Sequence, residues 1–303
     1  MPDFLERLIE GPPVLLDGPT GTELQRRGFE TNIPGWTAAA IESAPETLLE
    51  IHRDYVAAGA EVLTANTFRT HPRNLAPLVP ESDREAVGRL AAEWTCRAVE
   101  IARRAAADAK RPIWIAGSQA PLGDCYEPER TPDEAMLERE HRQMSEHLAA
   151  AGVDLILVET HPTLREALAV TRAALSTELP VITSFVCSRK GTLLSGESLE
   201  AAARELAQLP VAAICVNCIL ADDGLAAVAS LRRASNDRPV GIYANVGWFT
   251  ADEGWRKSNA TDPDVYARYA VDWISAGVRI LGGCCGTTPE HIARLRRLLD
   301  ENG

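Results

Sequence analysis

The sequence predicts an α/β protein in which residues 1–303 form one domain, a (β/α)8 TIM barrel. Short apolar runs rich in β-branched residues recur eight times, and each is followed by a polar loop and then by a helical pattern. Eight such alternations are typical of a closed parallel sheet surrounded by helices, and no low-complexity linker divides the chain. The predicted strands are 14–16, 62–64, 113–116, 155–158, 181–185, 213–216, 241–244 and 279–281.

The intervening helices are recognised by their apolar spacing and by prolines. Leu137, Met144 and Leu148 share one helical face, and His141 lies on that same face, so it is expected to be a core residue rather than a catalytic base. Proline is favoured in the first turn of a helix, because no intrahelical donor is lost there. The helix starts predicted in this way are Pro45, Pro132, Pro162, Pro263 and Pro289.

An open, doubly wound sheet is the alternative arrangement of the same elements. Such a sheet binds nucleotides through a glycine-rich turn after its first strand, with the pattern G-x-G-x-x-G. Here the first strand is followed by DGPTGT, residues 17–22, in which the glycine spacing differs and Pro19 removes a backbone donor. The sequence therefore favours the barrel and gives no support to nucleotide binding.

The composition disfavours several classes of function. Aspartate and glutamate number 43 against 31 lysines and arginines, and no basic patch for a nucleic acid stands out. The N-terminus has acidic residues where a signal peptide needs a basic flank, and no apolar run approaches the roughly 18 residues of a membrane span. We therefore expect a cytoplasmic protein with small-molecule partners and without a nucleic-acid or membrane partner. Its seven cysteines favour metal binding or catalysis over a disulfide framework.

The long connections of the predicted barrel are those that follow strands. In a parallel barrel all of these connections open onto the C-terminal face of the sheet, where the active sites of this fold lie. We therefore expect the functional residues to lie within or next to the segments 17–40, 65–80, 117–131, 186–196 and 245–261.

The strongest chemical signal is LGGCCGTTPEH, residues 281–291, at the end of the eighth strand. Adjacent side chains on a regular strand point to opposite faces, so Cys284 and Cys285 can bind one ion only if the backbone leaves the strand there. Three glycines permit this departure by allowing positive φ angles. They are Gly282, Gly283 and Gly286, and the segment 288–290 is expected to form the N-cap and first turn of the closing helix.

A third thiol lies at the end of the sixth strand, in CVNC, residues 215–218. The sixth and eighth strands are both even-numbered, and alternate strands contribute to the same interior layer, so their upper ends can face one another across the barrel mouth. Three thiolates and one open position are the ligand set of a catalytic zinc ion. The sequence therefore predicts a Zn²⁺ site formed by Cys218, Cys284 and Cys285.

Other interpretations of the cysteines stay open. Cys215 would complete a closed cage with a purely structural zinc, although residues 215 and 218 are expected to face opposite sides of the strand. Alternatively, the cysteines fill the core, where cysteine is common. A barrel hydrolase is disfavoured, because such sites collect histidines and carboxylates and the six histidines show no metal-binding spacing. Cys96, on a predicted outer helix, and Cys125 and Cys187, on loops, are placed outside the metal site.

Motifs spread over nearly the whole chain resemble those of the homocysteine S-methyltransferase family. The most specific is GGCCGTTPEHI together with VNC at this separation. Supporting motifs are LLDGPTGTEL (15–24), TANTFRTHP (64–72), GSQAPLGDCYEP (117–128), VETHPTLREA (158–167) and YAN (243–245). The resemblance implies a zinc-dependent enzyme on a (β/α)8 barrel that transfers a methyl group to the thiol of homocysteine and so forms methionine.

The resemblance also implies roles for individual residues. Cys218, Cys284 and Cys285 match the zinc thiolates of the family, and Asp17 and Glu159 match carboxylates close to the amino acid substrate. Such a carboxylate would pair with the ammonium group of homocysteine, and helix capping is the alternative role for both acids. Further substrate contacts are expected at the strand ends from Asn66, Thr67, Phe68, Asn217, Tyr243 and Asn245.

The methyl donor is less constrained by the sequence. The chain is too short to carry folate and cobalamin domains, which favours a small donor such as S-methylmethionine, S-adenosylmethionine or betaine. Trp248 and Trp255 either face such a cation through their rings or pack within their loop. Two loops depart from the family pattern, with YANVG where YPNSG is common and SQAPLGDCY where GPYG is common. Another thiol or selenol acceptor stays possible, because zinc activation does not distinguish such close analogues.

Overall fold

The strands of the chain form a nearly closed barrel. The computed structural model describes residues 3–107, 109–250 and 254–301, and within these ranges eight parallel strands follow the order β1, β10, β7, β6, β5, β4, β3, β2. A bridge between Leu16 and Val62 joins the two outermost strands, which confirms the predicted fold class. The barrel strands are β1 (Val14–Leu15), β2 (Val62–Ala65), β3 (Trp114–Gln119), β4 (Leu155–His161), β5 (Val181–Phe185), β6 (Ala213–Leu220), β7 (Val240–Asn245) and β10 (Ile280–Gly283).

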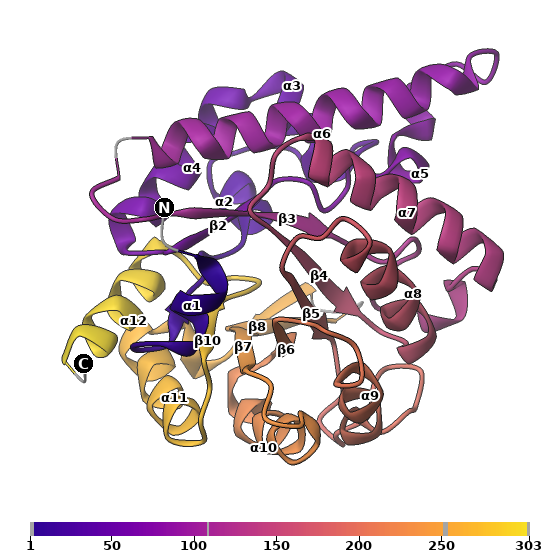
Figure 1. Ribbon diagram of the computed structural model, residues 1–303. Coiled ribbons are helices and arrows are strands. Elements are labelled where there is room, and N and C mark those ends of the chain that lie inside the picture. The colour runs from indigo at the N-terminus through magenta and orange to yellow at the C-terminus, as the bar shows by residue number, and fades with distance from the viewer. Residues whose placement is uncertain (1–2, 108, 251–253, 302–303) are drawn as a thin grey trace.

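Helices surround these strands (Figure 1). The outer ones are α4 (Pro45–Ala58), α6 (Arg84–Ala106), α7 (Glu134–Ala150), α8 (Leu164–Leu175), α9 (Leu199–Leu206), α10 (Gly224–Ala234), α11 (Pro263–Ser275) and α12 (Pro289–Glu301). Shorter helices are α1 (Phe4–Ile9), α2 (Thr20–Arg26), α3 (Ala40–Ser43) and α5 (Pro72–Leu75), with 3-10 turns at Trp36–Ala39, Ala76–Leu78, Pro128–Arg130, Ala221–Asp223 and Asn259–Thr261. None of the helices in the described ranges has the length and apolar character that a membrane crossing requires.

Three of the five predicted proline starts are correct. Pro45, Pro263 and Pro289 are the first residues of α4, α11 and α12. Pro132 and Pro162 instead precede the N-cap residues of α7 and α8, which are Asp133 and Thr163. Each of these N-cap side chains accepts a hydrogen bond from a backbone N–H of the first turn, so the cap rather than the proline begins the helix.

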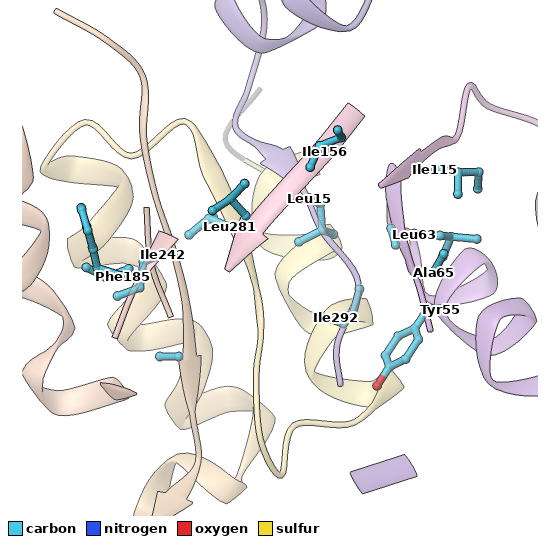
Figure 2. Packing of buried hydrophobic residues seen from close by; sticks show 14 of the residues in the cluster. Leu15, Tyr55, Leu63, Ala65, Ile115, Ile156, Phe185, Ile242, Leu281 and Ile292 are labelled. Carbon is cyan, nitrogen blue, oxygen red and sulfur yellow. The ribbon is translucent and has the colours of Figure 1, made fainter. Parts of the chain in front are cut away.

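Side chains of the strands alternate between two buried clusters. Those that point outward pack against the helices, and Figure 2 shows this cluster, with Leu15, Leu281 and the α12 residue Ile292 among its members. Those that point inward fill the barrel, including Val14 and Leu16 on either side of Leu15. Each fully buried leucine or isoleucine stabilises the fold by about 1.5–3 kcal/mol relative to exposure, so both clusters hold the barrel rigid beneath its loops.

The N-terminal end of the barrel is closed by α1. Phe4 packs edge to face on Trp114 at the start of β3, with ring centroids 5.7 Å apart, and Leu8 is buried. Glu61, just before β2, binds Arg7 of α1 with a shortest N–O distance of 2.9 Å. Because this end is filled and paired, the opposite end of the barrel is left for ligands.

The seventh loop contains a hairpin that the sequence analysis did not predict. Within the segment 245–261, β8 (Gly247–Thr250) pairs in antiparallel fashion with β9 (Gly254–Lys257). Trp248 and Trp255 lie on these two strands, and 39% and 38% of their surfaces are exposed. The hairpin is separate from the barrel sheet, so the predicted βα alternation remains intact around it.

Candidate active site

The C-terminal ends of the strands surround a cavity of about 580 Å³. It is lined by residues near the ends of β4, β6 and β7 and by residues at the ends of β1, β2, β3 and β10 or in the segments that follow them, which is the face on which the fold places active sites. Most of the predicted site residues lie in its wall: Asp17, Asn66, Phe68, Glu159, Asn217, Cys218, Tyr243, Cys284 and Cys285.

Three cysteine sulfurs converge on one side of this cavity. The Sγ of Cys218 lies 2.8 Å from that of Cys284 and 4.0 Å from that of Cys285, and all three sulfurs lie within 4.8 Å of one another. A zinc ion bound at about 2.3 Å holds tetrahedral sulfurs about 3.8 Å apart, so modest side-chain rotations suffice for these three to share one ion. The cluster can therefore hold a metal ion, and the cavity gives a further ligand access to it.

Cys215 is outside this cluster. Its side chain is fully buried among the inward-facing residues of the barrel, below the mouth, and a Cβ placed on Gly241 would contact its sulfur. Cys215 thus lies in the barrel interior and Cys218 in the cavity wall, and the two are kept apart by an irregularity of β6 rather than by regular strand alternation. Within the described ranges, Cys215 does not join the metal-binding group, so the arrangement does not match a four-cysteine cage.

Cys218 reaches the cluster because β6 is interrupted. The pairing of β6 with β7 shifts between Asn217 and Leu220, and Cys218 has a φ of 54° in the left-handed region. A non-glycine residue in this region costs about 1–3 kcal/mol and persists only where its surroundings hold it. β4 has a matching irregularity at Thr160, with φ of 66°.

The Asn217 side chain joins these two irregular segments. Its Oδ1 accepts hydrogen bonds from the backbone N–H of Thr160 at 3.1 Å and from the Ser184 hydroxyl at 2.7 Å, and its Nδ2 donates to Thr160 Oγ1 at 2.7 Å. Its Nδ2 also lies 4.0 Å from the Cys284 sulfur. Asn217 therefore stabilises the backbone that presents the thiols, in addition to lining the cavity.

The glycines around the cysteine pair act differently from the prediction. Gly286 has a φ of 81°, as expected, but Gly282 and Gly283 do not have positive φ angles. A Cβ on Gly282 would lie 2.8 Å from the Cβ of Leu16, and one on Gly283 would lie 2.2 Å from Thr287 Oγ1. These two positions require glycine for close packing. Of these three glycines, only Gly286, directly after the cysteine pair, has the left-handed conformation.

Two buried carboxylates lie in the wall of the same cavity. Asp17 accepts hydrogen bonds of 2.8 Å from both the backbone N–H and the hydroxyl of Thr64, and Glu159 accepts one from the Ser118 hydroxyl. Burial raises the pKa of Asp17 to about 7, against the Thr64 hydrogen bonds that lower it. Burial likewise raises the pKa of Glu159 to about 7. Neither acid caps a helix, and both would gain from a cationic ligand.

Of three further residues that were predicted to contact substrate, one lines the cavity and two lie outside its wall. Tyr243 lines the cavity, and its buried hydroxyl is close enough to the Glu159 carboxyl to lower the pKa of that group. Thr67 and Asn245 are buried but are absent from the described cavity wall. The Thr67 hydroxyl donates to the Ser118 backbone oxygen at 2.9 Å, so this residue supports the wall from behind.

Several cavity residues were missed by the sequence analysis. Trp36, Arg69 and Tyr126 line the cavity on the side of the loops that follow β1, β2 and β3, whereas the described parts of Trp248 and Trp255 do not reach the wall. Cys125 also lines the cavity, and burial raises the pKa of its thiol to about 12, which keeps it protonated. The signal that could have found them is their position in the long post-strand loops, but loop conformation is not readable from spacing.

The other side chains considered in the sequence lie away from the site. Cys96 is on α6 and Cys187 is on the loop after β5, as predicted. His141 is fully buried, with its Nε2 3.0 Å from Glu166 Oε1, as expected for a core histidine with a partner. The Thr288 hydroxyl pairs with Glu290 and with the ring of His291 at the start of α12.

Comparison with known proteins gives a consistent result along the whole chain. Residues 14–299 match the family described as Homocysteine S-methyltransferase. The chain is 29% identical to Homocysteine S-methyltransferase 3 of Arabidopsis thaliana, over 99% of this chain and 93% of the relative. It is 27% identical to Selenocysteine methyltransferase of Astragalus bisulcatus, over 98% and 95%. Among solved structures, it is similar to the metallated form of the homocysteine methyltransferase MmuM from Escherichia coli, with a TM-score of 0.82, 28% identity and coverage of 96% and 98%.

Proposed function

The chain belongs to the homocysteine S-methyltransferase family, and we propose that it transfers a methyl group from a small donor to the thiol of homocysteine, which yields methionine. The observation that carries this proposal is the convergence of three cysteine sulfurs and two buried carboxylates in one cavity. In a thiol amino acid, the sulfur would bind at the cysteine cluster and the ammonium group would pair with the carboxylates. We further propose that residues 1–303 form a single homocysteine-binding domain that acts in the cytoplasm on small molecules.

We assign Cys218, Cys284 and Cys285 as ligands of a zinc ion. Three thiolates with access to a cavity are a donor set typical of catalytic zinc. Zinc bound there would deprotonate the homocysteine thiol, which is otherwise mostly protonated at neutral pH, and so supply a nucleophile. The thiolate attacks the methyl carbon of the donor, a C–S bond forms, and the donor's bond to that carbon breaks with its electron pair remaining on the donor.

The two carboxylates are proposed to bind the ammonium group of homocysteine. Asp17 and Glu159 both have pKa values raised to about 7 by burial, so a nearby cation would favour their charged forms. Thr64 and Ser118 hold the carboxylates in place by hydrogen bonds. The buried hydroxyl of Tyr243, next to the Glu159 carboxyl, offers a further polar contact. Holding the amino acid at this end fixes its sulfur near the cysteines, which converts a bimolecular collision into a positioned displacement.

The proposal is tested by incubating zinc-loaded protein with homocysteine and each of S-methylmethionine, S-adenosylmethionine, betaine and methyltetrahydrofolate. Methionine is expected with at least one of the three small donors. A Cys96→Ser variant is expected to form methionine like the wild type and serves as the control for variants of the three cluster cysteines, since Cys96 lies on α6, outside the cavity. Absence of methionine with every donor, from protein that holds one zinc per chain, would contradict the proposal.

A selenol acceptor is the second candidate. The similarity to a relative named Selenocysteine methyltransferase favours it, because a metal site that activates a thiol also accepts the close selenium analogue. Running the same assay with selenocysteine in place of homocysteine distinguishes the two acceptors. A kcat/KM for selenocysteine above that for homocysteine would make the selenol the preferred substrate.

A further inference from the structure

We propose that Arg69 determines the specificity for the methyl donor by binding a carboxylate of it. This inference rests on the proposed function and names its donor class: zwitterions that carry an acidic end as well as a methylated cationic centre. Arg69 follows β2, and β2 lies four strands from β6 in a ring of eight, so the two stand on opposite sides of the barrel. The same cavity is lined by Arg69 and by Cys218 at the end of β6.

The guanidinium of Arg69 is held by aromatic rings. Its Cζ lies 5.0 Å from the ring centroid of Phe68 and 6.0 Å from that of Trp36, and these two rings pack edge to face. Stacking engages the flat faces of a guanidinium and leaves its in-plane N–H groups available. One of these donates to the backbone oxygen of Gly123 at 3.4 Å, a long contact that leaves further donors free.

Arg69 has no carboxylate within ion-pair distance in the part of the chain that the structure describes. The same wall contains Asp124, next in the chain to Gly123, and its Oδ1 accepts a hydrogen bond from the backbone N–H of Tyr126 at 2.8 Å. By contrast Arg73, four residues further along, pairs with Glu140 at 2.8 Å. An oriented guanidinium with open donors, facing a cavity, is suited to bidentate recognition of a carboxylate.

The charges of the cavity also fix how a zwitterionic donor lies. A sulfonium or quaternary ammonium is repelled from the rings of Trp36 and Phe68, because the Arg69 cation already stacks on them. The thiolates that the cysteines would carry with a bound metal attract a cation instead, whereas Asp17 and Glu159 pair with the ammonium group of homocysteine. The donor therefore places its carboxylate at Arg69 and its methylated centre toward the bound homocysteine sulfur.

The test compares donors that differ only in the carboxylate. The pair is S-methylmethionine and its carboxamide, or betaine and its carboxamide if betaine is the better donor, with methionine formation as the readout. The wild-type kcat/KM is expected to be about 10- to 100-fold higher for the acid, the loss that follows removal of a charge-assisted hydrogen bond. In an Arg69→Met variant this ratio should fall to about 1, with the KM for homocysteine little changed.

Two further variants complete the test. Arg69→Lys, which keeps the charge without the stacked guanidinium, is expected to give an intermediate ratio, and it decides the question if the methionine variant is too slow to measure. Arg73→Met is the matched control and should retain the wild-type ratio, because Arg73 lies outside the described cavity wall.

If the ratio of kcat/KM for the acid donor to that for its carboxamide stays at the wild-type value in Arg69→Met, the inference is overturned. A rise in the KM for homocysteine with an unchanged KM for the donor would also overturn it, because the arginine would then bind the acceptor. These results differ from a failure of the proposed function, in which wild-type protein forms no methionine from any donor. That outcome removes the inference together with its premise.

Discussion

In the described part of the chain, charged side chains are paired with one another at the N-terminal end of the barrel and lack such pairing in the cavity at the C-terminal end. At the N-terminal end, Glu61 accepts hydrogen bonds from Arg7 and from the backbone N–H of Leu15, and Arg296 lies 3.8 Å away. At the C-terminal end, Asp17 and Glu159 are buried with hydroxyl and backbone donors but without a cation among the described residues. Within the same residues, Arg69 faces the cavity without an acid at ion-pair distance.

This difference separates stability from function within one fold. Pairing charges inside the protein stabilises the closed end, whereas unpaired charges at the mouth raise the free energy of the empty protein and are relieved by a ligand. The left-handed backbone at Thr160 and Cys218 is a second cost confined to the mouth. Variants at the two ends should therefore change different measurements.

The largest expected effect comes from the metal cluster. Replacing Cys284 by serine removes one of three sulfur ligands, so zinc content should fall well below one per chain and methyl transfer should drop at least about 100-fold. The fold should persist, because Cys284 is only partly buried at the margin of the inward-facing core and serine is close to it in size. Metal analysis and circular dichroism of the variant check both statements, and a zinc-loaded, active Cys284→Ser protein would remove the cluster from the mechanism.

The next effect concerns substrate binding at the mouth. Asp17→Asn removes a proposed charge partner of the homocysteine ammonium, which should raise the KM for homocysteine about 10- to 100-fold and change kcat little. Steady-state kinetics at saturating donor measure this effect. A variant with an unchanged KM would mean that Asp17 serves the fold alone.

The same substitution should also change how the free energy of unfolding depends on pH. Burial raises the pKa of Asp17 from 3.8 to about 7, so between these values the folded protein holds a proton that the unfolded chain has lost. The resulting stability is full below about pH 3.8 and is lost as the pH rises through about 7, a change of up to about 4 kcal/mol. Asp17→Asn should therefore gain stability relative to wild type between pH 5 and pH 8, as measured by urea unfolding of protein without substrates. A difference that is constant with pH would contradict this pKa.

At the closed end, Glu61→Gln should affect stability alone. It leaves Arg7 and Arg296 without their shared carboxylate, and these side chains are less than one-fifth exposed, so the free energy of unfolding should fall by about 1–3 kcal/mol. Kinetic constants at 25 °C should stay within about twofold of wild type. Glu85→Gln, in the exposed pair with Arg89, is the control with little expected effect.

The smallest effect is expected in the hairpin. Trp248 is absent from the cavity wall that the structure describes, so Trp248→Ala should change the KM of the donor less than about twofold. The alternative from the sequence, in which this ring binds the donor cation, predicts a loss of about tenfold. Donor saturation curves for the two proteins separate these outcomes.

The parts of the structure that the sequence predicted are those encoded by periodicity and spacing. The eight barrel strands follow from alternating βα patterns, and the family resemblance is confirmed. The approach of Cys218 to Cys284 follows from their places on the sixth and eighth strands. These features depend on contacts that recur in every barrel, so a local pattern suffices to predict them.

What the sequence did not predict depends on loop conformation and close packing. Trp36 and Arg69 reach the cavity because their loops fold over the mouth. The register shift at Cys218 is held by the hydrogen bond of the neighbouring Asn217 side chain to Thr160, which is distant in the sequence. Gly282 and Gly283 were expected to have positive φ angles, but they are required by the proximity of neighbouring side chains. Such tertiary contacts leave no periodic signal in the sequence.

The central claim is that three cysteines hold a metal ion whose fourth position belongs to the substrate. X-ray absorption at the zinc edge of wild-type protein, with and without homocysteine, tests it most directly. Three sulfurs at about 2.3 Å and one lighter atom are expected without homocysteine, and four sulfurs with it. Four sulfurs already present before homocysteine is added, or no change on its addition, would contradict the claim.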